Sequence, residues 1–337
     1  MRDLVAEKQK VKVHLDALAK GADPAGIFAP GAVAQIVHPW GIRTGPARIG
    51  EFYRALRVAL PDQERREDLF LAGENHPDDR VDGPRFTPLV ASLGALQATF
   101  TAPLLGIPPT HGVVHLRLAE VHHLNPHGRI VRSWLFPDLL DLIDQAGHWP
   151  IAPMLGAPGL WPGPKGGHGA RHDSVDPQGG AESLGRVLAM HDALHEFDGI
   201  SINSMPMSAW SEHFMYYAAA GIGISRGLDG FRAHHQVPFL HAFPDRRGAG
   251  HFIRIGDGPF AVTGGAVAIT HSREYLGMAP TGRALTAQVM DFYHLDAEGR
   301  ICENWLPFDI LGLAAQMGVN VLSRVHHRTG RPKRDIH

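Results

Sequence analysis

The sequence has little cysteine and no long hydrophobic run. Its one cysteine, Cys302, excludes an intrachain disulfide and any zinc cluster built from several cysteines. The longest apolar runs are far too short to span a bilayer. The N-terminus carries Arg2, Asp3, Glu7 and Lys8 among its first residues and is too charged for a signal peptide. These absences predict a soluble, cytoplasmic protein with no membrane partner.

Neither sign of charge is in excess. Lys and Arg total 32, Asp and Glu total 34, and the formal net charge is −2. A nucleic-acid-binding face would need a clustered basic excess, and the one basic run, in the tail at 326–337, is interpreted as a solvated terminus. Apolar residues make up 44% of the chain, which is typical of a globular protein rather than a disordered one. We therefore expect no nucleic-acid partner.

Histidine is abundant, with 23 residues. His191 and His195 have the i, i+4 spacing that can place two imidazoles on one metal ion. The inner glutamate of the H-E-x-x-H pattern is missing and no third ligand is identifiable, so we expect no metal site. The glycine-rich stretches have no Walker pattern, and no G-x-G-x-x-G follows a strand. No cofactor is therefore predicted.

The chain contains an internal duplication. Residues 123–147 repeat at 294–318 with a constant offset of 171, and 12 of these 25 positions are identical. Further upstream, GIRTG at 41–45 faces GISRG at 223–227. Because the landmarks keep their order, the sequence predicts two tandem domains. We place the parts of the chain as follows: a first domain at 1–147, a Pro/Gly-rich linker at 148–180, a second domain at 181–325 and a basic tail at 326–337.

The linker holds apolar residues that a solvated tether does not need. Trp149, Leu155, Leu160 and Trp161 lie among its prolines and glycines. We expect the linker to run across the surface with its aromatic residues docked, strapping the domains together; a free tether is the alternative.

Each half shows the same succession of helix-like and strand-like stretches. Helical periodicity comes first, and runs rich in β-formers, broken by glycine-containing turns, come afterwards. Helices first and antiparallel strands later predict an α+β architecture. The expected helices are 5–19, 49–60 and 139–145, then 184–197, 228–242 and 310–316; the expected hairpin strands are 113–124 with 130–136, and 286–295 with 301–306.

The repeated unit resembles the SnoaL-like polyketide cyclase family, within the nuclear transport factor 2-like superfold. The matching pieces are a glycine-led helix ending in Leu-Pro-Asp or Phe-Pro-Asp, a hairpin reading Gly-Arg-Ile-x4-Trp-x3-Asp, and a helix ending Gln-x-Gly. They cover about 140 residues in each half. The resemblance implies two tandem cone-shaped, cystatin-like domains, each a curved antiparallel sheet packed on helices around an apolar cavity. It also implies a pseudo-dimer within one chain, and a homodimer is left open.

Asp138 and Asp309 are the first candidates for chemistry. Each follows a tryptophan, Trp134 or Trp305, by four residues. The resemblance implies that an Asp in this place acts as general acid/base, and that the tryptophans shape the cavity. A carboxylate beside an indole in an apolar cavity is also desolvated, which raises its pKa toward the range of a general base. Alternatively, each Asp caps the helix that follows it.

Glu120 and Asp291 occupy the same place in the two repeats, on the strand before. Either could be a second acid/base or hydrogen-bond the substrate oxygen. The alternative is a solvent-facing acid paired with Arg117, Arg132 or Arg300.

Further pocket candidates belong to the second half alone. Arg226 and His235 flank or lie on the helix expected at 228–242, and His213, after Trp210, adds to the set. The alternative is that they pack or hydrogen-bond without a catalytic role. The first half lacks the pair His234-His235, which favours the second half as the active one.

The function predicted from these features is cofactor-free acid/base chemistry on a small hydrophobic carbonyl compound. The reaction would be an aldol-type cyclisation, an isomerisation or a hydration of the hydratase/lyase type. The alternative is a non-catalytic small-ligand-binding protein with one degenerate domain.

Overall fold

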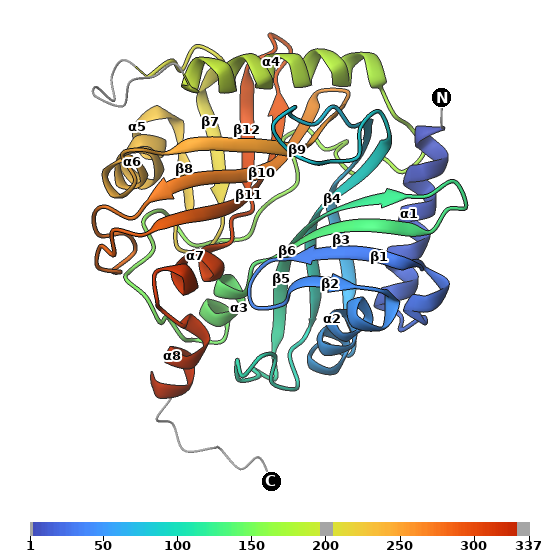
Figure 1. The fold of residues 1–337 in the computed structure, drawn as a ribbon, viewed down its shortest axis with the longest axis horizontal. Coiled ribbons are helices and arrows are strands. Elements are labelled where there is room, and N and C mark those ends of the chain that lie inside the picture. Colours follow the sequence, from blue (N-terminus) through green and yellow to red (C-terminus); the bar gives the residue numbers. More distant parts are fainter. Residues whose placement is uncertain (1–2, 196–204, 329–337) are drawn as a thin grey trace.

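The computed structural model describes residues 3–195 and 205–328, and it contains two six-stranded sheets, each packed against helices (Figure 1). The strand order is β2-β1-β6-β5-β4-β3 in the first sheet and β8-β7-β12-β11-β10-β9 in the second. The two orders correspond strand for strand. The structure thus confirms the α+β class and the two tandem cone-shaped domains.

The first domain, blue to green in Figure 1, begins with a helix and ends with a short one. Its elements are α1 (Leu4–Ala19), the 3-10 turn η1 (Pro24–Gly26), β1 (Phe28–Ile36), β2 (Gly41–Thr44), α2 (Pro46–Ala59), β3 (Glu64–Glu74), β4 (Pro88–Thr99), β5 (Val113–Leu124), β6 (Ile130–Pro137) and α3 (Leu139–Gln145).

The second domain, yellow-green to red, repeats this order and adds a terminal helix. Its elements are α4 (Pro177–His195), β7 (Trp210–Ala218), β8 (Ile224–Arg226), α5 (Gly227–Phe231), the π-helical turn η3 (Arg232–Gln236), α6 (Val237–Ala242), β9 (Arg247–Asp257), β10 (Phe260–Thr270), β11 (Ala284–Leu295), β12 (Ile301–Leu306), α7 (Ile310–Gln316) and α8 (Val321–Arg328). None of the described helices is long and apolar enough to cross a membrane.

The predicted elements agree with these bounds to within three residues, except at the start of α4. α4 begins at Pro177, inside the segment that the sequence assigned to the linker, because proline is tolerated in the first turn of a helix. The end of the helix expected at 184–197 and most of the basic tail lie outside the described residues.

The hairpin turns show why the repeat is so well preserved there. Between β5 and β6, the Asn125 side chain accepts hydrogen bonds from the backbone N–H groups of His127 and Arg129, both at 3.0 Å. Gly128 has a φ of 73°, in the left-handed region that glycine adopts without strain. Asp296 makes the equivalent bonds in the second domain. The turn therefore fixes the pairing register of the strands on both sides.

The two sheets pack against one another through a hydrophobic cluster that involves both tryptophans of the repeat. Trp134 is 1% exposed and stacks on Phe252 of the other domain, with ring centroids 5.4 Å apart. Trp305 is fully buried and stacks on Tyr217 at 5.4 Å. The prediction that these indoles shape a ligand cavity is therefore wrong. Successive strand residues point to opposite faces, and both tryptophans lie on the face turned toward the other sheet.

A buried ion pair also joins the domains. Nζ of Lys8, on α1, lies 2.9 Å from Oδ2 of Asp257, on β9. The same carboxylate accepts the backbone N–H of Ala72 at 3.1 Å. An unpaired charge here would be costly, so the pair fixes how α1 and β9 meet.

The linker is docked rather than free. Trp161 is buried in the cluster between the sheets, and its Nε1 donates to the carbonyl oxygen of Ala218 at 3.3 Å. The guanidinium carbon of Arg117 lies 4.7 Å from the centre of the Trp161 ring. Leu160, by contrast, is 58% exposed. Trp161 thus anchors the linker to both domains.

Candidate functional site

The second domain encloses a partly open cavity of about 220 Å³ between its sheet and its helices. For comparison, an apolar cavity of about 150 Å³ takes up benzene. The space therefore suits a molecule with one or two rings. Most of the lining is apolar or aromatic, and the polar groups are few, as in many small-molecule sites. The main apolar side chains are Met190, Leu194, Trp210, Tyr216, Phe231, Phe239, Val267, Val289, Leu306 and Phe308; the polar ones include His191, His235, Arg246, His251, Asp291, Tyr293 and Asn304.

The helix that covers this cavity contains a π-helical turn. The sequence offset between the halves is 182 at Gly45 and Gly227 but 183 at Asp62 and Asp245, so the second domain has one extra residue in this helix. The turn η3 accommodates that residue. Such single-turn insertions occur often at functional sites. The change in offset is the sequence signal that marks this side of the cavity.

His235, in η3, lies in an aromatic cage. Its ring is stacked on Phe239 at 5.6 Å and lies 5.1 Å from that of Tyr216. Burial, and secondarily the charge of Arg246, lower the pKa of His235 to about 3. Its Nδ1 is buried and has no hydrogen-bond partner among the described residues. His235 is thus a neutral imidazole that can hydrogen-bond a ligand, as the sequence indicated.

Asp291 is the carboxylic acid of the cavity. It lies on β11 and lines the space, and its Oδ1 accepts a hydrogen bond from Nδ2 of Asn304 at 3.1 Å. Burial raises the pKa of Asp291 to about 7, although hydrogen bonds from Asn304 and Tyr293 oppose the rise. A carboxyl group with this pKa can both take and return a proton near neutral pH.

A row of polar rings continues from Asp291. The Tyr293 hydroxyl lies 3.0 Å from Nε2 of His191, a residue of α4. The ring of His191 lies 4.9 Å from that of His251, on β9. Nε2 of His191, one of the two imidazoles with metal-ligand spacing, is thus engaged with the tyrosine.

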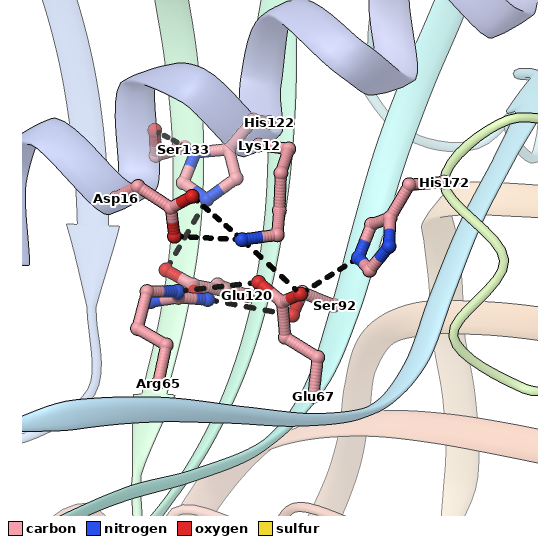
Figure 2. A network of polar contacts seen from close by, with 9 residues as sticks. All are labelled: Lys12, Asp16, Arg65, Glu67, Ser92, Glu120, His122, Ser133 and His172. Carbon is pink, nitrogen blue, oxygen red and sulfur yellow. Dashed lines mark hydrogen bonds and ion pairs between the residues drawn. The ribbon is translucent and has the colours of Figure 1, made fainter.

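The equivalent place in the first domain is filled by a polar network (Figure 2). Glu120, which matches Asp291, forms an ion pair with Arg65 and lies 3.2 Å from Nε2 of His122. Nδ1 of His122 lies 2.8 Å from the Ser133 hydroxyl. Burial alone would raise the pKa of Glu120, but Arg65 and His122 lower it to about 2. Glu120 is thus held as a carboxylate inside the protein, not on a solvent face with Arg117, Arg132 or Arg300.

Glu67 extends this network to α1 and the linker (Figure 2). Its carboxylate lies 3.4 Å from Arg65, 3.8 Å from Lys12 and 2.7 Å from Nε2 of His172. A small space beside Arg65, along β3 to β5, has no room for a water molecule. Among the described residues, the network of Arg65, Glu67 and Glu120 thus lies where the second domain has its cavity beside Asp291.

The strand register identifies a residue that differs between the two domains at this place. Arg65 pairs with Leu96, and Gly248 pairs with Val267. Leu96 and Val267 are separated by the repeat offset of 171, so Gly248 stands where Arg65 stands in the first domain. A glycine leaves open the volume that the arginine side chain fills.

Asp138 caps a helix and contacts the other domain. Its Oδ1 accepts the N–H of Asp141 at 3.1 Å, in the first turn of α3. Its Oδ2 accepts the N–H of Ala220, in the second domain, at 2.9 Å. The Arg117 guanidinium lies 3.2 Å from the same oxygen. Asp138 does not line the cavity.

Asp309 makes the equivalent contacts from the second domain to the first. Its Oδ1 accepts the N–H of Gly312 at 2.8 Å, and its Oδ2 accepts the N–H of His38, in the first domain, at 3.2 Å. Burial raises the pKa of Asp309, although these two N–H groups oppose the rise. Asp309 borders a groove of about 490 Å³ between the domains, which also includes Gln35 and Gln288, and does not line the cavity of the second domain.

Two other predicted pocket residues lie outside the cavity. His213, on β7, is exposed, because strand alternation turns Phe214 inward and His213 to solvent. Arg226, at the end of β8, is also exposed. Of the predicted pocket set, the structure brings together only Asp291 and His235. Arg246 and Asn304 were not predicted as pocket residues, whereas alternation along β11 places Tyr293 on the face of Asp291.

One group of side chains has metal-ligand character within the described ranges. Nδ1 of His294, Sγ of Cys302 and a carboxylate oxygen of Glu303 lie within 4.8 Å of one another. A β-bulge between β11 and β12 lets the neighbouring residues Cys302 and Glu303 approach the same imidazole. Here Nδ1 lies 2.8 Å from Glu303 Oε2, so the three groups satisfy one another by hydrogen bonding.

The fold and the cavity define the second domain as a curved-sheet α+β domain with an apolar ligand pocket. Residues 204–317 match the family described as SnoaL-like polyketide cyclase. This match confirms the resemblance in the second half, and the first half shares its repeat and its strand order. A search of curated proteins finds no match.

Solved structures similar to the chain cover about two fifths of it. AclR, a proposed hydroxylase from Streptomyces galilaeus, is 20% identical, covers 41% of this chain and 82% of its own, and has a TM-score of 0.35. IdmH, a proposed polyketide cyclase from Streptomyces antibioticus, is 19% identical, with coverages of 42% and 99% and a TM-score of 0.30. A protein of unknown function with a cystatin-like fold from Methylobium petroleophilum is 18% identical, with coverages of 40% and 77% and a TM-score of 0.28.

Proposed function

We propose that the second domain binds a small hydrophobic carbonyl compound and performs cofactor-free acid/base chemistry on it, of the cyclase or isomerase type. The observation that carries this proposal is Asp291, a carboxyl group in an apolar cavity with a pKa raised to about 7. The family match to residues 204–317 supports the same class of reaction.

The chemistry follows from the position of Asp291. As a carboxylate it removes the acidic proton beside a carbonyl, or between two carbonyls, and an enolate forms. Hydrogen bonds from Tyr293 and the neutral His235 then stabilise the enolate oxygen. In a cyclase, the enolate carbon attacks a second carbonyl of the same molecule, and the alkoxide that forms takes the proton back from Asp291. In an isomerase, the enolate takes the proton back from Asp291 at another carbon. A positioned base contributes about 10² to 10⁴ in rate.

The first domain has a supporting role in this proposal. Its acid is neutralised by Arg65, and the space beside that side chain is closed. The general acid/base role that the resemblance gave to Asp309 and Asp138 moves to Asp291, since those two aspartates already accept hydrogen bonds from helix ends and from the opposite domain.

The test is proton–deuterium exchange at the central carbon of a hydrophobic 1,3-diketone, 1-phenylbutane-1,3-dione, followed by NMR. Asp291→Asn is expected to reduce the enzyme-dependent exchange at least about 100-fold. The matched control Asp309→Asn, which changes the same atoms outside the cavity, is expected to stay within a few-fold of the wild type. Exchange should rise with pH with a midpoint near 7, because only ionised Asp291 accepts a proton.

Two results contradict the proposal. One is exchange by Asp291→Asn at the wild-type rate. The other is a wild-type protein that binds the diketone without exchanging its proton, which would leave the non-catalytic ligand-binding function in its place.

A further inference from the structure

Among the described residues, the cavity of the second domain contains an arginine that has no acidic partner. Arg246 lies between α6 and β9, is half-buried and lines the cavity. Within the part of the chain that the structure describes, its guanidinium makes no hydrogen bond or ion pair. Burial lowers the pKa of Arg246, and no neighbouring acid opposes that effect. Asp291 is not its partner, since that carboxyl is bonded to Asn304.

The first domain shows what a buried arginine requires, although Gly248, and not Arg246, occupies the strand position of Arg65. Arg65 is paired with Glu120 and Glu67 (Figure 2). Neither glutamate has an acidic counterpart near Arg246 among the lining residues: Asp291 replaces Glu120 and faces Asn304, and β9 carries glycine and histidine instead of Glu67. A cation taken out of water without a counter-charge is destabilising. A site that retains one is therefore suited to an anion from outside.

We infer that Arg246 binds a carboxylate of the ligand, so that the compound taken up by this cavity is a hydrophobic acid with one or two rings. A guanidinium binds a carboxylate through two parallel N–H···O bonds, which fixes orientation as well as position. The apolar body of the acid packs on Trp210, Phe231 and Phe239. This inference deepens the proposed function: the carboxylate holds the molecule, and Asp291 acts on a carbon activated by a separate carbonyl.

The neighbouring charges fit this assignment. His235 is neutral, so it does not repel Arg246 or compete for the anion. Arg247, the next residue, also lines the cavity but is exposed, and it helps to lower the pKa of Asp245. Within the described ranges, Arg246 is thus the more deeply buried cation of the cavity.

The test uses two probes of equal shape, 2-naphthoate and 2-naphthamide, titrated calorimetrically into the full-length protein at pH 7.5. The wild type is expected to bind the acid at least about tenfold more tightly than the amide, which has no charge to pair with Arg246. Arg246→Gln should reduce that preference to less than about twofold. Arg246→Lys, which keeps the charge but not the planar fork, should give an intermediate preference.

The matched control is Arg226→Gln, which removes the same charge from an exposed position outside the cavity and should leave the preference unchanged. Circular dichroism verifies that each variant is folded. Amide binding as tight as acid binding in the wild type, or no binding of either probe, overturns the inference. A preference unchanged in Arg246→Gln does the same.

The experiment also separates this inference from the proposed function. Asp291→Asn should lose proton exchange and keep the preference for naphthoate. If Asp291→Asn loses exchange but the wild type shows no preference for naphthoate over naphthamide, the proposed function stands and the assignment of a ligand carboxylate to Arg246 is wrong. If Arg246→Gln slows exchange of the neutral diketone but leaves naphthoate affinity unchanged, Arg246 acts on the enolate oxygen, and the carboxylate assignment is wrong.

Discussion

The buried pair Arg65–Glu120 allows a quantitative prediction about the first domain. Glu120→Gln keeps the shape of the side chain and removes its charge, so the buried Arg65 loses its closest counter-charge. Glu67 remains at 3.4 Å and compensates in part. We expect a large loss in the free energy of unfolding, because an ion that was paired on folding is then buried with weaker compensation.

The magnitude follows from the pKa of Glu120. A carboxyl whose pKa falls from 4.5 to about 2 on folding contributes about 3 kcal/mol at neutral pH. Removing one partner of a buried pair typically costs about 3–5 kcal/mol, which agrees. Because the folded-state pKa is depressed, this contribution is complete above pH 4.5 and declines as the pH falls toward 2. At pH 3 we expect about 1 kcal/mol to remain.

The assay is urea unfolding followed by circular dichroism, at pH 7 and at pH 3, with hydrogen exchange of β5 amides to assign the transition to the first domain. Glu64→Gln is the matched control, since Glu64 forms an exposed pair with Arg66 and should contribute less than about 1 kcal/mol. A loss below about 1 kcal/mol for Glu120→Gln at pH 7 would refute the reasoning. So would an equal loss at both pH values.

Two further predictions concern the interface and the cavity. Asp138→Ala and Asp309→Ala each remove a helix cap and leave a backbone N–H of the other domain without its acceptor. We expect each variant to lose about 2–4 kcal/mol of the free energy of unfolding, measured by thermal unfolding, and the Asn variants to lose less. Diketone exchange per folded molecule should be unchanged. A drop in exchange without a drop in stability would return the base role to these residues. Gly248→Arg is expected to form an ion pair with Asp291, like that of Arg65 with Glu120 in the first domain. The new side chain should close the cavity and weaken naphthoate binding at least tenfold. The ion pair should also move the midpoint of proton exchange below pH 7. Unchanged binding and an unchanged midpoint would show that register does not explain the difference between the domains.

Much of the fold is readable from the sequence because the repeat supplies each element twice. The bounds of α3, β5, β12 and α7 follow from glycine turns, β-formers and the Asp that opens each closing helix, all of which act locally.

The site was harder to predict, because it depends on which face of a strand each residue occupies. Trp305 and Asn304 are neighbours in sequence, yet one lies between the sheets and the other lines the cavity. Asp138 and Asp309 have helix-cap partners that the sequence indicated, but their second partners, Ala220 and His38, lie in the opposite domain. No local pattern shows such a contact. Asp291 was recognised as a candidate, but not as the acid of the cavity, since its raised pKa depends on burial that only tertiary packing produces.

The contrast between Arg65 and Gly248 has a consequence for the evolution of such a chain. When two identical subunits come from one gene, every substitution appears in both sites at once, so a residue that closes one pocket closes the other. Fusion into a single chain removes that constraint. One copy can then exchange its pocket for a charged interior, while the other keeps an opening. Here the contrast between the copies includes one strand position, where the same register accepts a long cation in one copy and no side chain in the other.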